Sequence, residues 1–436
     1  MIPDDRAVWR IAAPMILSNI SVPLLGMVDT GVVGHLENAS YLGAVAIGAT
    51  IFGFLYTGFN FLRMGTTGIA AQRYGAEDND GIRVSLGQAL IVALLIAFAL
   101  LALQVPIGTL ALSLVGGDPD VQASAQVYYS IRIWSAPGTL ANYVMIGWFL
   151  GLQNARVPLL IFLTINLTNI VLDLLFVVVF GMKVDGVALA SVIAEYTALL
   201  LALTLAAREL RRRSGHWPLH RLFNIRAYAA FFSVNAHLFV RTMALVFTYF
   251  FVTAQGARLG GLVLAANAVL INLHNITSFG LDGFAHAAEA LVGKAVGERR
   301  REALEQSVRL CLKWSLFFAV GFSVAYAVVG PLVIDALTDL ADVRSAAREY
   351  LPWFIIAPLV AVWSFLYDGV YVGATRAREM RDIMVISTFL VFLPAWYLLQ
   401  GLGNHGLWLA FTIFLASRGI GMHLWYRRRV LASIAA

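Results

Sequence analysis

The sequence predicts an all-α polytopic membrane protein whose twelve transmembrane helices form two similar six-helix lobes. Three observations predict this fold class. The 436-residue chain is 60% hydrophobic and only 13% charged, whereas soluble proteins carry roughly 25% charged residues. Apolar windows of about 20 residues, the length that crosses a bilayer as a helix, recur along the whole chain. The second half also repeats motifs of the first half at a nearly constant spacing.

Polar breaks divide the apolar sequence into candidate spans. We take each apolar window between two polar breaks as one helix that crosses the bilayer. The predicted spans are residues 11–33, 43–70, 85–113, 124–150, 157–180, 186–206, 228–254, 262–290, 306–333, 347–371, 382–400 and 405–426.

The connections between these spans alternate in charge. Of the 31 Lys and Arg residues, 21 lie near the two termini or in every second loop, and the connection at 207–226 alone holds six arginines. Because cytoplasmic loops carry the excess of Lys and Arg, both termini and this connection are predicted to be cytoplasmic. The regular alternation favours twelve spans over eleven or thirteen. Topology thus accounts for the formal charge of +6, and we expect no nucleic-acid partner.

The two halves share motifs at an offset of 222 residues. Residues 121–156 align without gaps on residues 343–378, and Gly75 of AAQRYGAE falls on Gly297 of LVGKAVGE. Since six spans separate the copies, both should have the same orientation in the membrane, as in transporters built from parallel repeats. We predict an N-terminal lobe at 1–207, a cytoplasmic linker at 208–226 and a C-terminal lobe at 227–436.

Two carboxylates in the first half are the main functional candidates. Asp29 lies deep in the first span, and Asp173 follows Asn166 and Asn169 on one face of the fifth span. A charge near the bilayer centre costs at least about 2.5 kcal/mol, so an intramembrane acid is a functional-site hypothesis by default. No Lys or Arg occurs in the first, fifth or sixth span. These acids therefore suit a proton relay, and permanent structural pairing is the alternative.

Other polar side chains in the first half are candidates for substrate binding. Tyr128 and Asn142 lie in the fourth span, Asn166 in the fifth and Ser191 in the sixth. The alternative for the amides and the serine is interhelical hydrogen bonding that aids packing.

Two prolines accompany Asp29 in the first span. Pro14 and Pro23 cannot donate a backbone hydrogen bond and each clashes with the preceding turn. A bendable helix with a titratable group can change conformation on protonation. We therefore predict that this helix bends, although prolines also occur in transmembrane helices that do not move.

The second half carries a different polar set. Asp282 and His274 lie along one stripe of the eighth span, Asp368 lies in the tenth and Arg241 in the seventh. We predict that Asp282 and Asp368 bind substrate, and the alternative pairs Arg241 with Asp282 as a buried ion pair. His274 is expected to be a hydrogen-bonded packing residue rather than a metal ligand.

These motifs resemble the multidrug and toxic compound extrusion (MATE) transporter family, and within it the DinF-like branch. The resemblance rests on MVDTGVVGHL in the first span, GLQNARVP after the fourth, LDGFAHAAEALVGKAVG in the eighth and DGVYVGATRAR after the tenth. It implies a V-shaped cavity between the lobes and secondary active export of small organic, often cationic, compounds across the inner membrane. It also implies that Asp29 is the coupling acid, that Asn169 and Asp173 are its partners, and that Ser191 lies at a position that is Thr in some relatives.

The resemblance also leaves alternatives. Asp368 matches a position linked to sodium in another branch, but the seventh span lacks the acidic partner and offers Arg241 instead. This favours protons at Asp29 and Asp173 over sodium as the coupling ion. The alternatives are a sodium-coupled exporter, a lipid-linked flippase of the same superfamily, which would need a basic cavity, and an intramembrane aspartyl protease. We expect no enzymatic activity, cofactor or metal, membrane lipids as partners, and a functional monomer.

Overall fold

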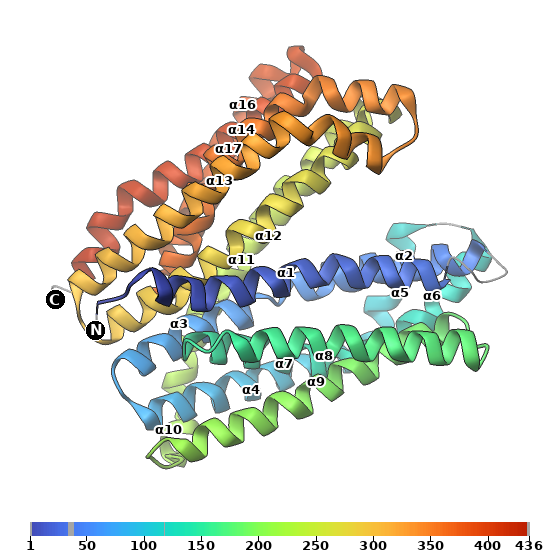
Figure 1. Cartoon of the computed structure of the whole chain (residues 1–436). Coiled ribbons are helices and arrows are strands. Elements are labelled where there is room, and N and C mark those ends of the chain that lie inside the picture. The colour runs from blue at the N-terminus through green and yellow to red at the C-terminus, as the bar shows by residue number, and fades with distance from the viewer. Residues whose placement is uncertain (1, 34–38, 117, 434–436) are drawn as a thin grey trace. The chain divides into compact units, whose positions relative to one another are not determined.

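The computed structural model describes residues 2–33, 39–116 and 118–433, with side chains for all of these except 22–33, 39, 225, 227, 230 and 433. This part of the chain is helical, with short 3₁₀ and π turns and no strand among the residues described (Figure 1). It divides into two compact units. The N-terminal unit is Leu17–Ala229, and the C-terminal unit combines Met1–Ile16 with Ala230–Ala436.

The N-terminal unit packs its helices around α7. Helix α7 contacts α3, α4, α8 and α9, and α2 packs on α6. Besides the second half of α1 (Asp5–Val33), the unit contains α2 (Ala39–Gly58), α3 (Phe61–Gly75), α4 (Asn79–Ala102), α5 (Gln104–Val115), α6 (Pro119–Arg132), η1 (Ile133–Ser135), α7 (Ala136–Gly151), α8 (Arg156–Asp173), η2 (Leu174–Val179), α9 (Val184–Arg212) and α10 (Leu219–Leu222).

The C-terminal unit is organised around α14. Helices α12, α13 and α17 all pack on α14, and α16 packs on α17. These helices are yellow (α12), orange (α13 and α14) and red (α16 and α17) in Figure 1. The elements are α11 (Ile225–Arg258), α12 (Gly261–Gly297), α13 (Arg301–Leu337), α14 (Ala341–Gly373), α15 (Ala377–Val385), η3 (Ile386–Phe392), α16 (Leu393–Leu399), η4 (Gln400–Leu402), α17 (Gly403–Trp425), η5 (Tyr426–Val430) and η6 (Leu431–Ser433).

The first turns of α1 pack within the C-terminal unit. Asp5 accepts hydrogen bonds from Lys313 Nζ at 3.0 Å and Trp314 Nε1 at 2.7 Å, and the ring of Trp9 packs edge-on against Phe284. The hydrogen bond from Lys313 is the main cause that lowers the pKa of Asp5. The predicted lobe boundaries at 207 and 227 stay a prediction, and the packing units differ from them in this N-terminal segment.

Helix starts follow the capping residues in the sequence. Asp78 precedes α4 and accepts a hydrogen bond from the backbone N–H of Gly81 at 2.8 Å. Asp118 precedes α6, accepts from Asp120 N at 3.0 Å and is followed by Pro119 at the first helical position. An aspartate before the first helical residue satisfies a backbone N–H that has no partner within the helix. A proline at the first helical residue removes no hydrogen bond of the helix, because the N–H at that position has no partner within the helix.

The cytoplasmic linker predicted at 208–226 is docked on α4. The buried Arg83 guanidinium donates to four backbone carbonyls, those of Asn79, Leu210, Arg213 and Ser214, at 2.8 to 3.1 Å. Asp80 Oδ1 accepts from the backbone N–H of His216 at 2.7 Å. Arg83 therefore satisfies carbonyls at the end of α9 and holds the connection against the N-terminal unit.

Nine stretches within the described residues are long and apolar enough to cross a membrane. One of them, Ala377–Val430, contains the turn at η4, after which α17 packs back on α15 and α16. This stretch thus covers the eleventh and twelfth predicted spans. The all-helical membrane fold is confirmed, while the exact number of twelve spans and the V-shaped cavity stay predictions.

The internal repeat is visible in the backbone. Among the described residues, the non-glycine residues with a positive φ fall into two pairs. Glu77 and Arg299 both have φ 54°, and Gln153 and Thr375 have φ 60° and 52°. Each pair is separated by 222 residues, the offset found in the sequence. Non-glycine residues seldom adopt positive φ, so the two units repeat the same loop geometry.

A second repeated feature is a close helix crossing. A Cβ atom on Gly147 of α7 would come within 2.3 Å of the Arg63 carbonyl oxygen of α3. A Cβ atom on Gly369 of α14 would come within 2.2 Å of the Ala285 carbonyl oxygen of α12. Both members of each contact are again offset by 222 residues. Helix α3 therefore crosses α7 as α12 crosses α14.

Candidate functional site

The polar face of α8 forms the candidate site in the N-terminal unit. Asp173 is fully buried, and Asn169, one turn earlier, is 1% exposed. Asn169 Nδ2 donates to the Ser191 hydroxyl of α9 at 3.1 Å, and Asn166 Nδ2 donates to the Ser21 carbonyl of α1 at 3.0 Å. The structure thus brings together the fifth-span and sixth-span residues that the sequence singled out.

The backbone changes its winding directly after Asp173. Residues Leu174–Val179 form a π turn, in which the N–H of Phe180 donates to the Leu175 carbonyl five residues earlier at 3.0 Å. π turns inside helices are rare and often lie at functional sites. No pattern in the sequence predicted this irregularity.

The first-span candidates are only partly described. Asp29 and Pro23 lie outside the residues whose side chains the structure describes. Pro14 lies within α1, two residues before the end of the segment that packs with the C-terminal unit. The coupling role of Asp29 and the bending of this helix stay predictions.

A buried ion pair in the N-terminal unit was missed at the sequence level. Glu195 of α9, 7% exposed, lies 3.8 Å from Arg132 Nη2 of α6. Asn142 Nδ2 of α7 donates to both the Glu195 backbone carbonyl and Oε2 at 2.9 Å. The amide of Asn142, a predicted substrate ligand, is thus hydrogen-bonded to Glu195 of this pair. Glu195 lies within an apolar predicted span, and that signal could have identified it.

Aromatic side chains surround Arg132. Its guanidinium lies 5.7 Å from the ring centre of Phe52 and 5.9 Å from that of Tyr56. Tyr128, another predicted substrate ligand, is 5% exposed and lies on the same helix as Arg132. Arg132 is therefore held by a carboxylate and by cation–π contacts.

The carboxylate of Asp368 is shared by two arginines. Arg241 of α11 donates to its Oδ2 atom, and Arg418 Nη2 of α17 donates to the same atom at 2.7 Å. The alternative that Arg241 pairs with Asp282 was therefore wrong about the partner. Asp282, on α12, is partly buried and lies within electrostatic reach of Tyr249, as both arginines do. Spacing within one helix cannot identify a partner on another.

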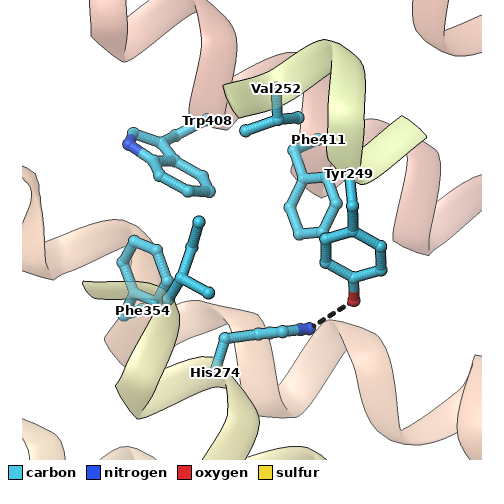
Figure 2. Close-up of a pocket in the computed structure, with 7 residues that line it drawn as sticks. Tyr249, Val252, His274, Phe354, Trp408 and Phe411 are labelled. Atoms are coloured by element: carbon cyan, nitrogen blue, oxygen red, sulfur yellow. Dashed lines mark hydrogen bonds between the residues drawn. The ribbon is translucent and has the colours of Figure 1, made fainter. Parts of the chain in front are cut away.

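An aromatic pocket surrounds His274 (Figure 2). The Tyr249 hydroxyl and His274 Nε2 form a hydrogen bond of 2.8 Å, which confirms that His274 is a hydrogen-bonded packing residue. Phe354, Trp408 and Phe411 also line this pocket, and the space between the side chains does not admit even a water molecule. Sites for drug-sized ligands measure about 300–1,000 Å³. This pocket therefore positions His274 and is too small for such a compound.

No group of three or more His, Cys, Asp or Glu side chains in the described part of the chain is arranged to hold a metal ion. The polar side chains form three sets, which are the α8 set and the Arg132–Glu195 set in the N-terminal unit and the Asp368 set in the C-terminal unit. The α8 set offers a carboxylate with amide and hydroxyl neighbours, which is suited to proton exchange. The Asp368 set offers two guanidiniums and one carboxylate.

Comparisons with known proteins identify the family. The MatE family model matches residues 14–175 and again residues 238–398, once in each half. DNA damage-inducible protein F of Escherichia coli K12 is 42% identical over 425 residues, which cover 98% of this chain and 92% of that protein. Human multidrug and toxin extrusion protein 1 is 27% identical over 92% of this chain and 71% of its own length.

Solved structures show the same fold. One described as the outward-facing conformation of a multidrug resistance MATE family transporter superposes with a TM-score of 0.88 at 20% sequence identity. The superposition covers 99% of this chain and 97% of that one. Given the matching family model and the 42% identical relative, the chain belongs to the MATE family of multidrug and toxin extrusion transporters, a family of multi-pass membrane proteins and not of enzymes.

Proposed function

We propose that the protein is a proton-coupled antiporter that exports small organic, often cationic, compounds across a bacterial inner membrane, with both termini in the cytoplasm. The observation that carries the proposal is the complete burial of the Asp173 carboxylate on an apolar helix, one turn from Asn169. The amide of Asn169 can donate to an ionised carboxylate and accept from a protonated one. This pair therefore supports both protonation states.

Competition for one negative charge would couple the two fluxes. A proton and a cationic substrate neutralise the same carboxylate, so the binding of one disfavours the other. Protonation from outside would release the substrate there, and loss of the proton inside would restore the charge for the next substrate. Asp29 is proposed as the second acid of this relay.

The charge of the substrate decides which gradient contributes. For an uncharged compound, one proton entering down 100 mV contributes about 2.3 kcal/mol, or roughly a fifty-fold concentration ratio. A monovalent cation exchanged for one proton moves no net charge, so that exchange depends on the pH gradient alone.

The test is efflux of a fluorescent lipophilic cation from proteoliposomes, driven separately by a proton gradient and by a sodium gradient. The wild type is compared with Asp173→Asn and Asp29→Asn, and Asp120→Asn, which removes an exposed carboxylate, is the control. We expect proton-driven efflux that both substitutions abolish and the control retains. Efflux that needs only sodium, or that survives both substitutions, would refute the proton mechanism.

A further inference from the structure

The cluster of Arg241, Asp368 and Arg418 in the C-terminal unit has a distinctive bonding pattern. Both arginines donate to one and the same oxygen of Asp368, Oδ2. The three side chains are 10%, 14% and 5% exposed. They come from three different helices, α11, α14 and α17, so the packing of the unit brings them together.

Most hydrogen-bonding capacity of this cluster is unused. A guanidinium has five N–H groups in a planar fork. Among the described residues, each arginine finds only this one acceptor, and the buried Nε atoms of both, with Asp368 Oδ1, have no hydrogen-bond partner. Buried charged donors without acceptors are costly. The two buried Nε donors therefore indicate a ligand that the protein itself does not supply.

The charge of the cluster defines the ligand. Two guanidiniums and one carboxylate leave one net positive charge. A second carboxylate, Asp282, lies in the same region, because Tyr249 is within electrostatic reach of Asp282 and of both arginines. The Asp282 carboxylate reduces the positive potential of the cluster, and it repels multiply charged anions more strongly than singly charged ones. The aromatic ring of Phe414, 5.4 Å from the Arg418 guanidinium, covers that group without supplying an acceptor.

We propose that Arg241 and Arg418, bridged by Asp368, form a binding site for one monovalent anion, and that the anion is the carboxylate group of an organic compound. The planar fork of arginine matches a carboxylate in two parallel hydrogen bonds. Chloride carries the same single negative charge and is the alternative occupant of this site. The site excludes sodium at Asp368, and it is independent of the proton relay proposed for the N-terminal unit.

The test measures thermal unfolding of the purified full chain in detergent, in a Tris–HEPES buffer without chloride. Sodium acetate or sodium chloride is added at constant ionic strength. A bound anion raises the unfolding temperature in a saturable way. We expect saturation with acetate; saturation with chloride as well would show that the site recognises charge, and with acetate alone that it recognises the planar carboxylate.

Two substitutions with opposite effects separate anion binding from a structural role. Arg418→Gln leaves a neutral Arg241–Asp368 pair, so the apparent acetate affinity should fall roughly tenfold or more. Asp368→Asn keeps both arginines and removes the competing carboxylate, so acetate should bind more tightly and restore stability lost without it. Arg344→Gln, at an exposed salt bridge of the same unit, is the control.

Three results would overturn the proposal. The first is a wild type whose unfolding temperature does not depend on the anion. The second is an Arg418→Gln variant with the wild-type anion dependence. The third is equal loss of stability in both cluster variants with no change in anion dependence, which a purely structural ion pair predicts. If Arg418→Gln does not fold, Arg241→Gln takes its place, and the response of Asp368→Asn still decides between the two roles.

Discussion

At the scale of single residues, each unit buries charge in a different way. The N-terminal unit pairs one acid, Glu195, with one base, Arg132. The C-terminal unit places two bases on one acid. Buried charges are normally paired. The first arrangement is a one-to-one pair, whereas the second bonds two guanidiniums to a single carboxylate. The neutral pair therefore contributes to structure, and the unbalanced cluster is suited to binding.

Glu195→Gln tests the structural role of the neutral pair. The substitution leaves Arg132 partly buried without a charged partner, while glutamine keeps an oxygen for the amide of Asn142. We expect a loss of about 2 kcal/mol, below the 3–5 kcal/mol for a fully buried pair, measured as a lower unfolding temperature in detergent. Glu209 lies on the same helix as Glu195 and forms a partly exposed ion pair with Arg213. Glu209→Gln should therefore change stability by less than about 1 kcal/mol. Equal effects of the two substitutions would contradict this role.

At the scale of elements, close helix crossings determine how the spans pack. In both units a glycine lets one helix backbone lie directly on a carbonyl of another. Small residues allow such approach in membrane proteins, where packing rather than hydrophobicity drives helix association. The carbonyl oxygen belongs to the backbone and cannot turn away as a flexible side chain would.

Gly147→Ala and Gly369→Ala should therefore each destabilise the protein by about 1–3 kcal/mol, the usual cost of overpacking. Gly53→Ala in α2 and Gly321→Ala in α13 are matched controls, because an added Cβ meets nothing within 4 Å at either position. These controls should be neutral or slightly stabilising, since alanine favours the helix. The measurement is the unfolding temperature of the four variants, and a crossing variant as stable as its control would refute the argument.

At the scale of the whole molecule, the connection between the two halves is a docked segment and not a free tether. Arg83 of α4 binds four backbone carbonyls, three of which belong to residues 210–214. Arg83 is 4% exposed, so water cannot easily replace these contacts. The arginines of the linker other than Arg213, by contrast, are exposed and are potential trypsin sites.

Arg83→Ala should accelerate trypsin cleavage within residues 211–226 by roughly tenfold, because cleavage follows the population of the locally open segment. The rate is measured on the purified protein by the appearance of two half-length fragments. Arg73→Ala, which removes a largely exposed arginine of the same unit, should leave the rate unchanged. Unchanged cleavage in Arg83→Ala would show that the docking contacts do not limit opening.

The sequence predicted the whole molecule better than its sites. Hydropathy and the 222-residue offset were sufficient for the membrane fold and for the repeat, because each is a property of long segments. The contact of Asn169 with Ser191 agreed with the predicted grouping. The partner of Arg241 and the pair formed by Glu195 depended on which helices are neighbours, and spacing along one helix carries no such information. The π turn after Asp173 also left no recognisable pattern.

The paired crossings have a consequence for how the two halves diverged. At both helix crossings a glycine packs against backbone atoms of the facing helix. Those backbone atoms are the same whatever side chain the facing residue has. Each crossing has a second glycine one turn after the first, Gly151 on α7 and Gly373 on α14. A Cβ atom there would come within 2.8 Å of the Thr67 carbonyl oxygen in one unit and 2.5 Å of the Glu289 carbonyl oxygen in the other. Substitutions of side chains on the facing helix therefore leave the helix crossing unchanged. The two halves therefore share one backbone arrangement while their buried polar groups differ, with Asp173 beside amides in one half and two arginines on Asp368 in the other.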